Sequence, residues 1–241
     1  MVQRQQGQGL NMAAHVRACD PDRFFAALFA PAAQRDVLLL LYAFNHELAR
    51  AREVAREPML ALIRLQWWRE VVEGADKPHE IATPLRAAIA AGALDRAALL
   101  ALVDAREIEA EPAIADWTGF LRYVRATAGQ LAVEAARVLG VVDPAVSDLG
   151  TAYGIAGILR AAPFLAPQGR CLLPADGTGR AVLAAEAIRL LGAGARLPRA
   201  ALPAVLPAAL VRRDLARADF RPRLLTDRLA MLTAKWRGRV A

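Results

Sequence analysis

Acidic side chains at helical spacing are the first residues in this sequence whose pattern suggests chemistry. Asp104, Glu107 and Glu111 stand at positions i, i+3 and i+7, so a helix would place all three carboxylates on one face. Such a row would hold Mg²⁺ if a second acidic row faced it, because Mg²⁺ binds carboxylate oxygens. Arg106 is interleaved with the row and Pro112 follows it directly, which favours a solvated helix face over a metal site.

A second candidate begins at His46 and Glu47, which open a stretch similar to the HExxH motif of zinc proteases. Position 50 is an arginine, so the second imidazole one helical turn later is absent and zinc would lack a ligand. The other histidines and the cysteines are few and scattered, and the cysteines lack CxxC spacing: His15, His79, Cys19 and Cys171. We therefore expect neither a zinc site nor a disulfide scaffold.

Motifs for nucleophilic catalysis and for nucleotide binding are missing from the sequence. The single serine, Ser147, is followed by Asp148 and does not stand in a GxSxG frame. The chain has no GxxxxGK[ST] segment and no GxGxxG segment after a predicted strand. The sequence therefore supports neither a serine hydrolase nor a nucleotide-binding enzyme.

Two adjacent tryptophans, Trp67 and Trp68, suggest a surface on which bases or prenyl chains could stack. A tryptophan pair on a helix is more often one core residue and one half-buried neighbour. We expect that structural role here.

The net charge of +7 is concentrated at the C-terminal end of the chain. Residues 212–241 carry nine basic and three acidic side chains, whereas residues 1–211 carry 22 basic and 21 acidic ones. Apolar residues recur in this segment at helical spacing: Leu224, Leu225, Leu229, Leu232 and Trp236. Two interpretations stay open, a basic amphipathic helix on an anionic membrane surface and a packed helix with a solvated arginine face. We expect no nucleic-acid partner, because the arginines are not combined with a known reading motif.

Helical periodicity dominates the sequence from Asp20 onward, and no segment shows sustained alternation with a period of two. Prolines and glycines end the periodic segments at short intervals, which predicts about eight or nine helices in an all-α fold. We predict a flexible N-terminal tail over residues 1–19 and a single helical domain over residues 20–241.

The sequence also carries expectations about location. No apolar run is as long as the roughly 20 residues that a membrane-spanning helix needs. Residues 1–10 are rich in Gln and Gly and lack the apolar core of a signal peptide. We therefore expect a cytoplasmic protein, either soluble or peripheral at the inner membrane surface.

Several short motifs resemble the squalene/phytoene synthase family, in the order in which that family carries them. They lie at Phe29–Arg35, Leu41–Phe44, Tyr123–Gly129, Leu149–Arg160 and Gly169–Pro174, the last similar to the family's GRxYLP element. The resemblance implies the all-α isoprenoid-synthase-like helical bundle around a central cavity. Active members join two prenyl diphosphates, which Mg²⁺ grips between two facing aspartate-rich helices because Mg²⁺ takes carboxylate and phosphate oxygens together.

Most of the aspartates that the resemblance predicts on those two helices are replaced in this chain. In the first motif only Glu53 keeps a carboxylate, and the other positions are His46, Ala49 and Arg50. In the second motif Arg160 is retained, and the positions around it are Gly154, Gly157, Ala161 and Leu165. The replacement implies that the Mg²⁺ cage is lost and that the usual condensation does not occur.

One branch of the family keeps the fold without the full aspartate motifs, and Phe44–Ala49 followed by Ile63–Arg69 resembles it. A respiratory complex I assembly factor belongs to that branch. The first hypothesis is therefore a non-catalytic, cofactor-free protein that binds a partner protein, or a prenyl lipid or its diphosphate in the cavity. The alternative is an active prenyltransferase with a non-standard site, which alone would need Mg²⁺. The resemblance implies these cavity residues, with the arginines as anion contacts: Arg35, Tyr42, Glu53, Tyr123, Tyr153 and Arg160.

Overall fold

The structure is a computed structural model that describes residues 11–55, 57–192, 197–217 and 224–240. Within these ranges the regular secondary structure is helical, and the one extended pairing is an isolated bridge between Ile114 and Pro174. The α-helices are α1 (Met12–Cys19), α2 (Pro21–Ala27), α3 (Ala32–Val54), α4 (Pro58–Glu73), α5 (Ala82–Ala90), α6 (Arg96–Asp104), α7 (Trp117–Val124), α8 (Gln130–Val138), α9 (Pro144–Leu165), α10 (Arg180–Leu191), α11 (Leu202–Val205), α12 (Val211–Ala216) and α13 (Leu224–Arg237). The predicted all-α fold is confirmed.

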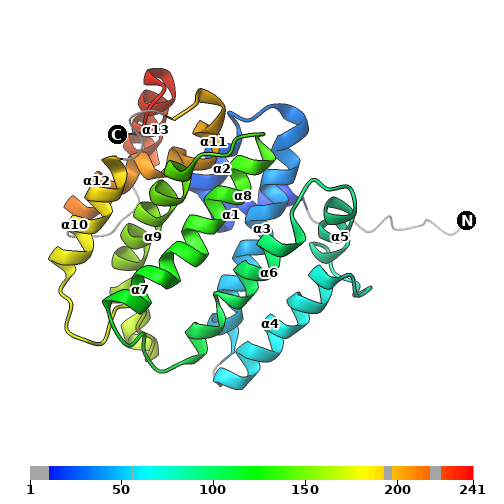
Figure 1. Cartoon of the computed structure of the whole chain (residues 1–241), viewed down its shortest axis with the longest axis horizontal. Coiled ribbons are helices and arrows are strands. Elements are labelled where there is room, and N and C mark those ends of the chain that lie inside the picture. The colour runs from blue at the N-terminus through cyan, green and yellow to red at the C-terminus, as the bar shows by residue number, and fades with distance from the viewer. Residues whose placement is uncertain (1–10, 56, 193–196, 218–223, 241) are drawn as a thin grey trace, which may run out of the picture.

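The longer helices lie side by side, and the shorter ones cover them (Figure 1). α3 packs against α4 and α8, and α9 packs against α8, α10 and α12. A π-helical turn, η2 (Arg125–Gly129), joins α7 to α8, so residues 117–138 run almost as one helix along α9. α13 closes the C-terminal end against α2 and against the 3-10 segment η6 (Leu206–Leu210).

The predicted flexible tail is wrong for residues 12–19, because they form α1 and pack against α3. Asn11 caps this helix, and its side chain accepts a hydrogen bond from the Ala14 amide at 3.0 Å. Val16 is completely buried and fixes the helix on the core. The sequence did not reveal α1 because its one fully buried residue gives no periodic pattern. Residues 1–10 of the predicted tail lie outside the described residues.

Capping residues followed by proline start two of the helices. The Asp20 side chain accepts a hydrogen bond from the Arg23 amide at 3.1 Å, and Pro21 occupies the first turn of α2. Asp143 and Pro144 start α9 in the same way. These short-range signals fix where α2 and α9 begin, and therefore which of their side chains face the interior.

Small residues let α9 approach η2 and α8 very closely. A Cβ atom added at Gly154 would lie 2.5 Å from the Ala128 Cβ and 2.6 Å from the Val124 Cγ1. A Cβ atom at Gly150 would lie 2.6 Å from the Ala132 Cβ. Real side chains do not approach so closely, so a larger residue at either position would force the helices apart.

The segment Pro144–Gln168, which contains α9, is long and apolar enough to cross a membrane, with a mean hydropathy of 1.3. The sequence alone did not predict such a segment, because Asp148, Arg160 and Pro163 interrupt its apolar residues. In the fold α9 is a core helix that packs against η2, α8, α10 and α12. Length and composition therefore identify an apolar core helix here as readily as a membrane span.

The acidic row and the tryptophan pair have the structural roles that the sequence favoured. Arg69 of α4 forms ion pairs with both Asp104 and Glu107, whose side chains are largely exposed. Trp68 is 3 % exposed, and Trp67 is half-buried beside it with the ring centroids 4.9 Å apart. Both predictions are confirmed.

Candidate functional site

A cavity with a volume of about 450 Å³ lies where α2, α3, η2 and α9 meet. This volume is within the range of about 300–1,000 Å³ that is typical of small-molecule sites. Part of the wall is apolar, and its residues come from α7, η2, α8, α9 and the segment after α9: Val124, Ala128, Leu131, Ile158, Leu165 and Leu172. The wall also carries charged residues, six arginines and five acidic residues. The cavity can therefore accept a molecule with an apolar body and a polar end.

Four of the six predicted cavity residues line this space: Glu53, Tyr123, Tyr153 and Arg160. Tyr42 lies behind the wall, fully buried, with the Arg23 guanidinium 5.9 Å from the centre of its ring. The Tyr42 hydroxyl is buried and has no hydrogen-bond partner among the described residues. Burial raises the pKa of this phenol above its usual range, so it is a neutral group.

The structure does not bring Arg35 to the cavity, so the predicted anion contact there is wrong. Its Nη2 donates hydrogen bonds to the carbonyls of Leu28 and Ala30, at 3.2 and 3.1 Å. These carbonyls belong to the turn between α2 and α3, where the backbone has no helical partners for them. Arg35 therefore stabilises the turn that precedes α3.

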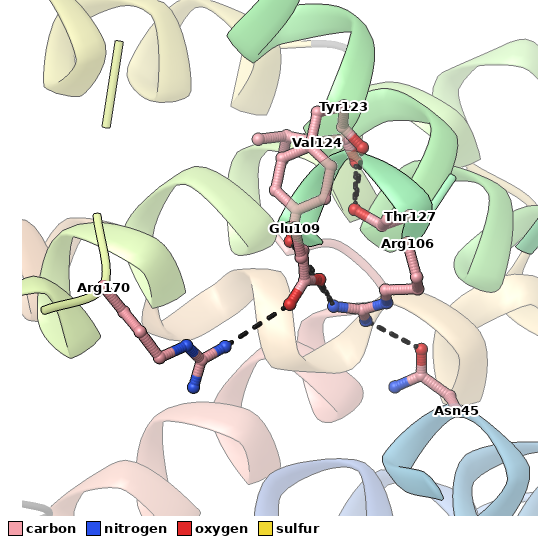
Figure 2. A network of polar contacts seen from close by, with 7 residues as sticks. All are labelled: Asn45, Arg106, Glu109, Tyr123, Val124, Thr127 and Arg170. Atoms are coloured by element: carbon pink, nitrogen blue, oxygen red, sulfur yellow. Dashed lines mark hydrogen bonds and ion pairs between the residues drawn. The ribbon is translucent and has the colours of Figure 1, made fainter. Parts of the chain in front are cut away.

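One carboxylate, Glu109, holds together the polar network on one side of the cavity (Figure 2). Its Oε1 accepts hydrogen bonds from the Arg106 Nη1 and from the Tyr123 hydroxyl, both at 2.7 Å. Its Oε2 pairs with the Arg170 Nη2 at 3.5 Å, and Arg106 also donates to the Asn45 side chain at 3.2 Å. Burial, together with the adjacent Glu109, raises the pKa of Tyr123 well above its usual range.

This network carries more positive than negative charge. Two guanidinium groups, Arg106 and Arg170, share the single carboxylate of Glu109. The Nη1 of Arg170 is buried and has no hydrogen-bond partner among the described residues. A buried, unused cationic donor is costly unless a ligand or water accepts its hydrogen bond. The Arg170 side therefore suits the polar end of a ligand.

A second polar network stands on the opposite side, around Tyr153 and Arg160 of α9. The Tyr153 hydroxyl donates to Asp22 at 2.9 Å, and the Arg23 guanidinium lies 5.1 Å from the centre of the Tyr153 ring. The Arg160 Nη1 pairs with Asp214 of α12 at 2.6 Å. Burial raises the pKa of the Asp22 carboxyl above its usual range, despite its hydrogen bond from Tyr153. Arg160 is thus occupied by an acid of the same chain.

The residues around this cavity do not fit a Mg²⁺ cage. From the positions that the family resemblance singled out, the wall receives Ala49, Glu53, Gly154, Gly157, Arg160, Ala161 and Leu165, of which only Glu53 has a carboxylate. Within the described residues, no three carboxylates bring one oxygen each to within 4.8 Å of one another. Mg²⁺ takes its ligands from carboxylate, water and substrate phosphate oxygens, and at these positions the wall offers the one carboxylate of Glu53.

Several residues that build the two networks were not predicted from the sequence, above all Glu109, Asp22 and Arg23. Glu109 stands within the acidic stretch that was interpreted as a solvated face, and its burial depends on Arg106 and Arg170. Arg170 carried a signal, since it belongs to the Gly169–Pro174 motif. For Asp22 and Arg23 the sequence held no signal of a role in the cavity, apart from their place in the first turn of α2.

Comparison with known proteins decides the family. Residues 16–202 match the squalene/phytoene synthase family, which is more than half of the chain. The chain belongs to this family. Among the solved structures similar to this squalene/phytoene synthase family member is a dehydrosqualene synthase in complex with a ligand, with a TM-score of 0.70 and 13 % identity over 94 % of both chains. A squalene synthase from Alicyclobacillus acidocaldarius has a TM-score of 0.64 and 18 % identity over 94 % of this chain and 92 % of that one. These likenesses confirm the predicted isoprenoid-synthase fold.

Relatives with higher sequence identity come from animals. The human protein named NADH dehydrogenase (ubiquinone) complex I, assembly factor 6 is 30 % identical over 170 residues, covering 67 % of this chain and 51 % of that protein. The mouse protein of the same name is 31 % identical with the same coverage, and the Drosophila melanogaster homolog is 27 % identical over 67 % and 52 %. This squalene/phytoene synthase family member therefore spans about half the length of the curated relatives it matches. The predicted resemblance to the complex I assembly branch is confirmed.

Proposed function

We propose that this protein is a non-catalytic member of its family, which holds a prenyl lipid in the cavity and serves the assembly of a respiratory NADH dehydrogenase complex. The observation that supports a non-catalytic protein is the set of residues that line the cavity wall. Where two acidic rows would hold Mg²⁺, the wall offers the carboxylate of Glu53 and the small or apolar residues Gly157, Ala161 and Leu165.

The arginines of the cavity support a prenyl lipid over a diphosphate as the ligand. Arg23, Arg106 and Arg160 pair with Asp20, Glu109 and Asp214, at distances between 2.6 and 2.7 Å. A guanidinium that is neutralised by an internal carboxylate has less attraction left for a multiply charged phosphate group. The buried Nη1 of Arg170 remains for a single polar group, such as a hydroxyl or carbonyl oxygen.

The assembly role comes from the relatives named for complex I assembly. Nothing in the cavity specifies a respiratory complex, so this part of the proposal needs a test in cells. Deleting the protein from its native cells should reduce the amount of assembled NADH dehydrogenase on native gels. A chain with Glu53→Gln should restore the complex as well as the unmodified chain does.

The catalytic alternative is tested directly by turnover. The purified full chain is incubated with Mg²⁺ and with farnesyl or geranylgeranyl diphosphate, and released diphosphate is measured. We expect no release above the protein-free control. Sustained release that Glu53→Gln abolishes would overturn the non-catalytic proposal and establish the prenyltransferase.

Ligand binding is tested by filling the cavity. Gly157 lines the cavity and no atom lies within 4 Å of a Cβ added there, so we expect Gly157→Leu to extend its side chain into the cavity. This variant should lose binding of a fluorescent farnesol analogue. The matched control is Gly192→Leu, at an open position outside the cavity lining, which should bind like the unmodified chain. Equal binding by both variants would contradict the cavity as the site.

A second candidate property, binding to an anionic membrane surface, is favoured by the outer face of α13. Leu225, Leu229, Leu232 and Trp236 lie along one face of this helix and are 80, 60, 41 and 84 % exposed. Asp227, Met231 and Ala234 face inward instead. The helix thus presents its apolar row to the outside, and the exposed basic residues Arg237 and Arg239 follow at its C-terminal end. We propose that this face binds an anionic lipid surface, since apolar and basic side chains together match its interface and its charge.

The membrane proposal is tested with vesicles that contain anionic phospholipid. The double variant Leu229→Asn with Trp236→Ala should lose most sedimentation with these vesicles at low salt. Val142 is 95 % exposed on another part of the surface, so Val142→Asn is the control and should bind normally. If the unmodified chain fails to sediment with the vesicles at low salt, the membrane proposal is wrong.

A further inference from the structure

Two histidines and a cysteine that are scattered in the sequence meet between α1 and α3. His15 and Cys19 stand four residues apart on α1, and therefore on one face of that helix. His46 comes from α3, against which α1 packs. The His15 and His46 rings lie with their centroids 5.6 Å apart, edge to face at 69°.

The ligand atoms of these three side chains are close enough for one metal ion. One nitrogen of each imidazole and the Cys19 Sγ all lie within 4.8 Å of one another. Around a tetrahedral Zn²⁺, with bonds of about 2.0–2.3 Å, neighbouring ligand atoms are roughly 3.5 Å apart. Small rotations of the side chains would close that difference. In the part of the chain that the structure describes, no other three His, Cys, Asp or Glu side chains meet this criterion.

A second observation points independently to a ligand at this place. The Nε2 of His15 is buried and has no hydrogen-bond partner among the described residues. A buried polar nitrogen without a partner is costly, and an ion that accepts its lone pair removes that cost.

The charges around the cluster favour a cation. Asp20 and Glu47 act on Cys19, and Glu47 and Glu53 act on His46. Two guanidinium groups pair with these acids, Arg50 with Glu47 at 3.1 Å and Arg23 with Asp20 at 2.7 Å. Carboxylates therefore outnumber guanidinium groups at the cluster.

We propose that His15, Cys19 and His46 form a binding site for a thiophilic divalent transition metal of the Zn²⁺ type. Two imidazoles and a thiolate are the ligands that Zn²⁺ prefers, whereas Mg²⁺ takes oxygen. Three protein ligands leave the fourth position of a tetrahedron open for water or another small ligand. The bound ion would fasten α1 to α3 beside the cavity, which Cys19 also lines. The site is independent of the proposed lipid ligand, because neither histidine lines the cavity.

The test uses the full chain without a histidine tag, stripped of metal and titrated with Zn²⁺ against a chromophoric chelator. We expect one tight equivalent per chain. Co²⁺ in place of Zn²⁺ should give the visible bands of a tetrahedral site together with a thiolate-to-cobalt charge-transfer band. Cys19→Ser and His46→Asn should each weaken binding by at least roughly tenfold and remove the charge-transfer band or the tetrahedral bands.

The chain offers matched controls for each ligand type. Cys171 is exposed and is not part of the cluster, and His79 packs against Trp67 and Trp68, so Cys171→Ser and His79→Asn should bind Zn²⁺ normally. Circular dichroism shows whether each variant is folded.

A separate measurement on the unmodified chain does not depend on the folding of a variant. Zn²⁺ should slow the alkylation of Cys19, followed by mass spectrometry, without slowing that of Cys171. The proposal is overturned if the unmodified chain binds no Zn²⁺, if folded Cys19→Ser binds it equally well, or if Zn²⁺ protects both cysteines alike.

Discussion

At the scale of single residues, Glu109 decides the charge balance of the cavity. Its side chain is 4 % exposed and serves two arginines and one tyrosine at once. Arg106 and Arg170 are both largely buried and depend on this one carboxylate as their counter-charge. Because Arg170 shares the Glu109 carboxylate with Arg106, its Nη1 is left to donate a hydrogen bond to a ligand.

Replacing Glu109 should therefore destabilise the protein strongly. Glu109→Gln leaves Arg106 and Arg170 buried without a counter-charge, and we expect a loss of about 3–5 kcal/mol in the free energy of unfolding. Urea denaturation followed by circular dichroism measures this loss. Glu111→Gln, two residues away at an exposed position, should change the free energy by less than about 0.5 kcal/mol. Equal losses for the two variants would show that Glu109 is not buried between the arginines.

Asp22 should make stability depend on pH in a predictable direction. Burial raises its pKa in the folded state, so the folded chain holds this proton more tightly than the unfolded chain does. Stability from this group is therefore fully present below the unfolded pKa of about 3.9 and is lost as the pH rises through the folded pKa.

The variant Asp22→Asn isolates this contribution, since an amide oxygen still accepts the hydrogen bond from Tyr153. We expect Asp22→Asn to be more stable than the unmodified chain at pH 7, with a difference that shrinks toward pH 4. Urea midpoints across this range give the comparison. A difference that grows as the pH falls would contradict the raised pKa.

At the scale of elements, the contact of α9 with η2 and α8 shapes the cavity wall. Gly154 and Gly157 are one turn apart on α9. Neighbouring atoms fill the space that a Cβ atom at Gly154 would need, whereas the space at Gly157 is open. The π-helical turn η2 also contains the buried residue Thr127. Its hydroxyl donates to the Tyr123 carbonyl at 2.8 Å (Figure 2). Close packing at Gly154 and open space at Gly157 together define the side of the cavity that α9 forms.

The two glycines should respond oppositely to the same substitution. Gly154→Ala would place a Cβ atom 2.5 Å from the Ala128 Cβ, and we expect a loss of about 1–3 kcal/mol in the free energy of unfolding. Gly157→Ala meets no atom within 4 Å and should stabilise the helix by about 0.5–1 kcal/mol. Thermal and urea unfolding of both variants test the pair, and losses of similar size would contradict this packing.

At the scale of the whole molecule, the N-terminal and C-terminal segments complete the bundle. α1 packs on α3, and α12 and α13 pack on α9, α2 and η6 (Figure 1). Residues distant in sequence therefore surround one cavity. The N-terminal and C-terminal helices thus line the same cavity as the central helices.

The role of α1 in the core can be measured at one residue. Val16 is fully buried, so Val16→Ala should reduce the free energy of unfolding by about 1–3 kcal/mol. Val142→Ala, the same change at a side chain that is 95 % exposed, should stay within about 0.5 kcal/mol of the unmodified chain. If Val16→Ala has no larger effect than Val142→Ala in urea denaturation, α1 is not part of the core.

The sequence by itself determined the helices, several of their starting points and the family, because caps, prolines and apolar periodicity act within a few residues of one another. Asp20, Pro21 and Pro144 illustrate this local control. Four of six predicted cavity residues followed from motif positions, since a family fold fixes which helix face is inward.

Only the tertiary structure decided which charges and ligands meet. Glu109 and Arg170 are 61 residues apart in the chain, and His15 reaches His46 only because α1 packs on α3. Gly154 and Gly157 look alike in the sequence, but the neighbouring helix closes one and leaves the other open. Local patterns set backbone conformation, whereas pairing and burial depend on packing between distant segments, which no short stretch of sequence encodes.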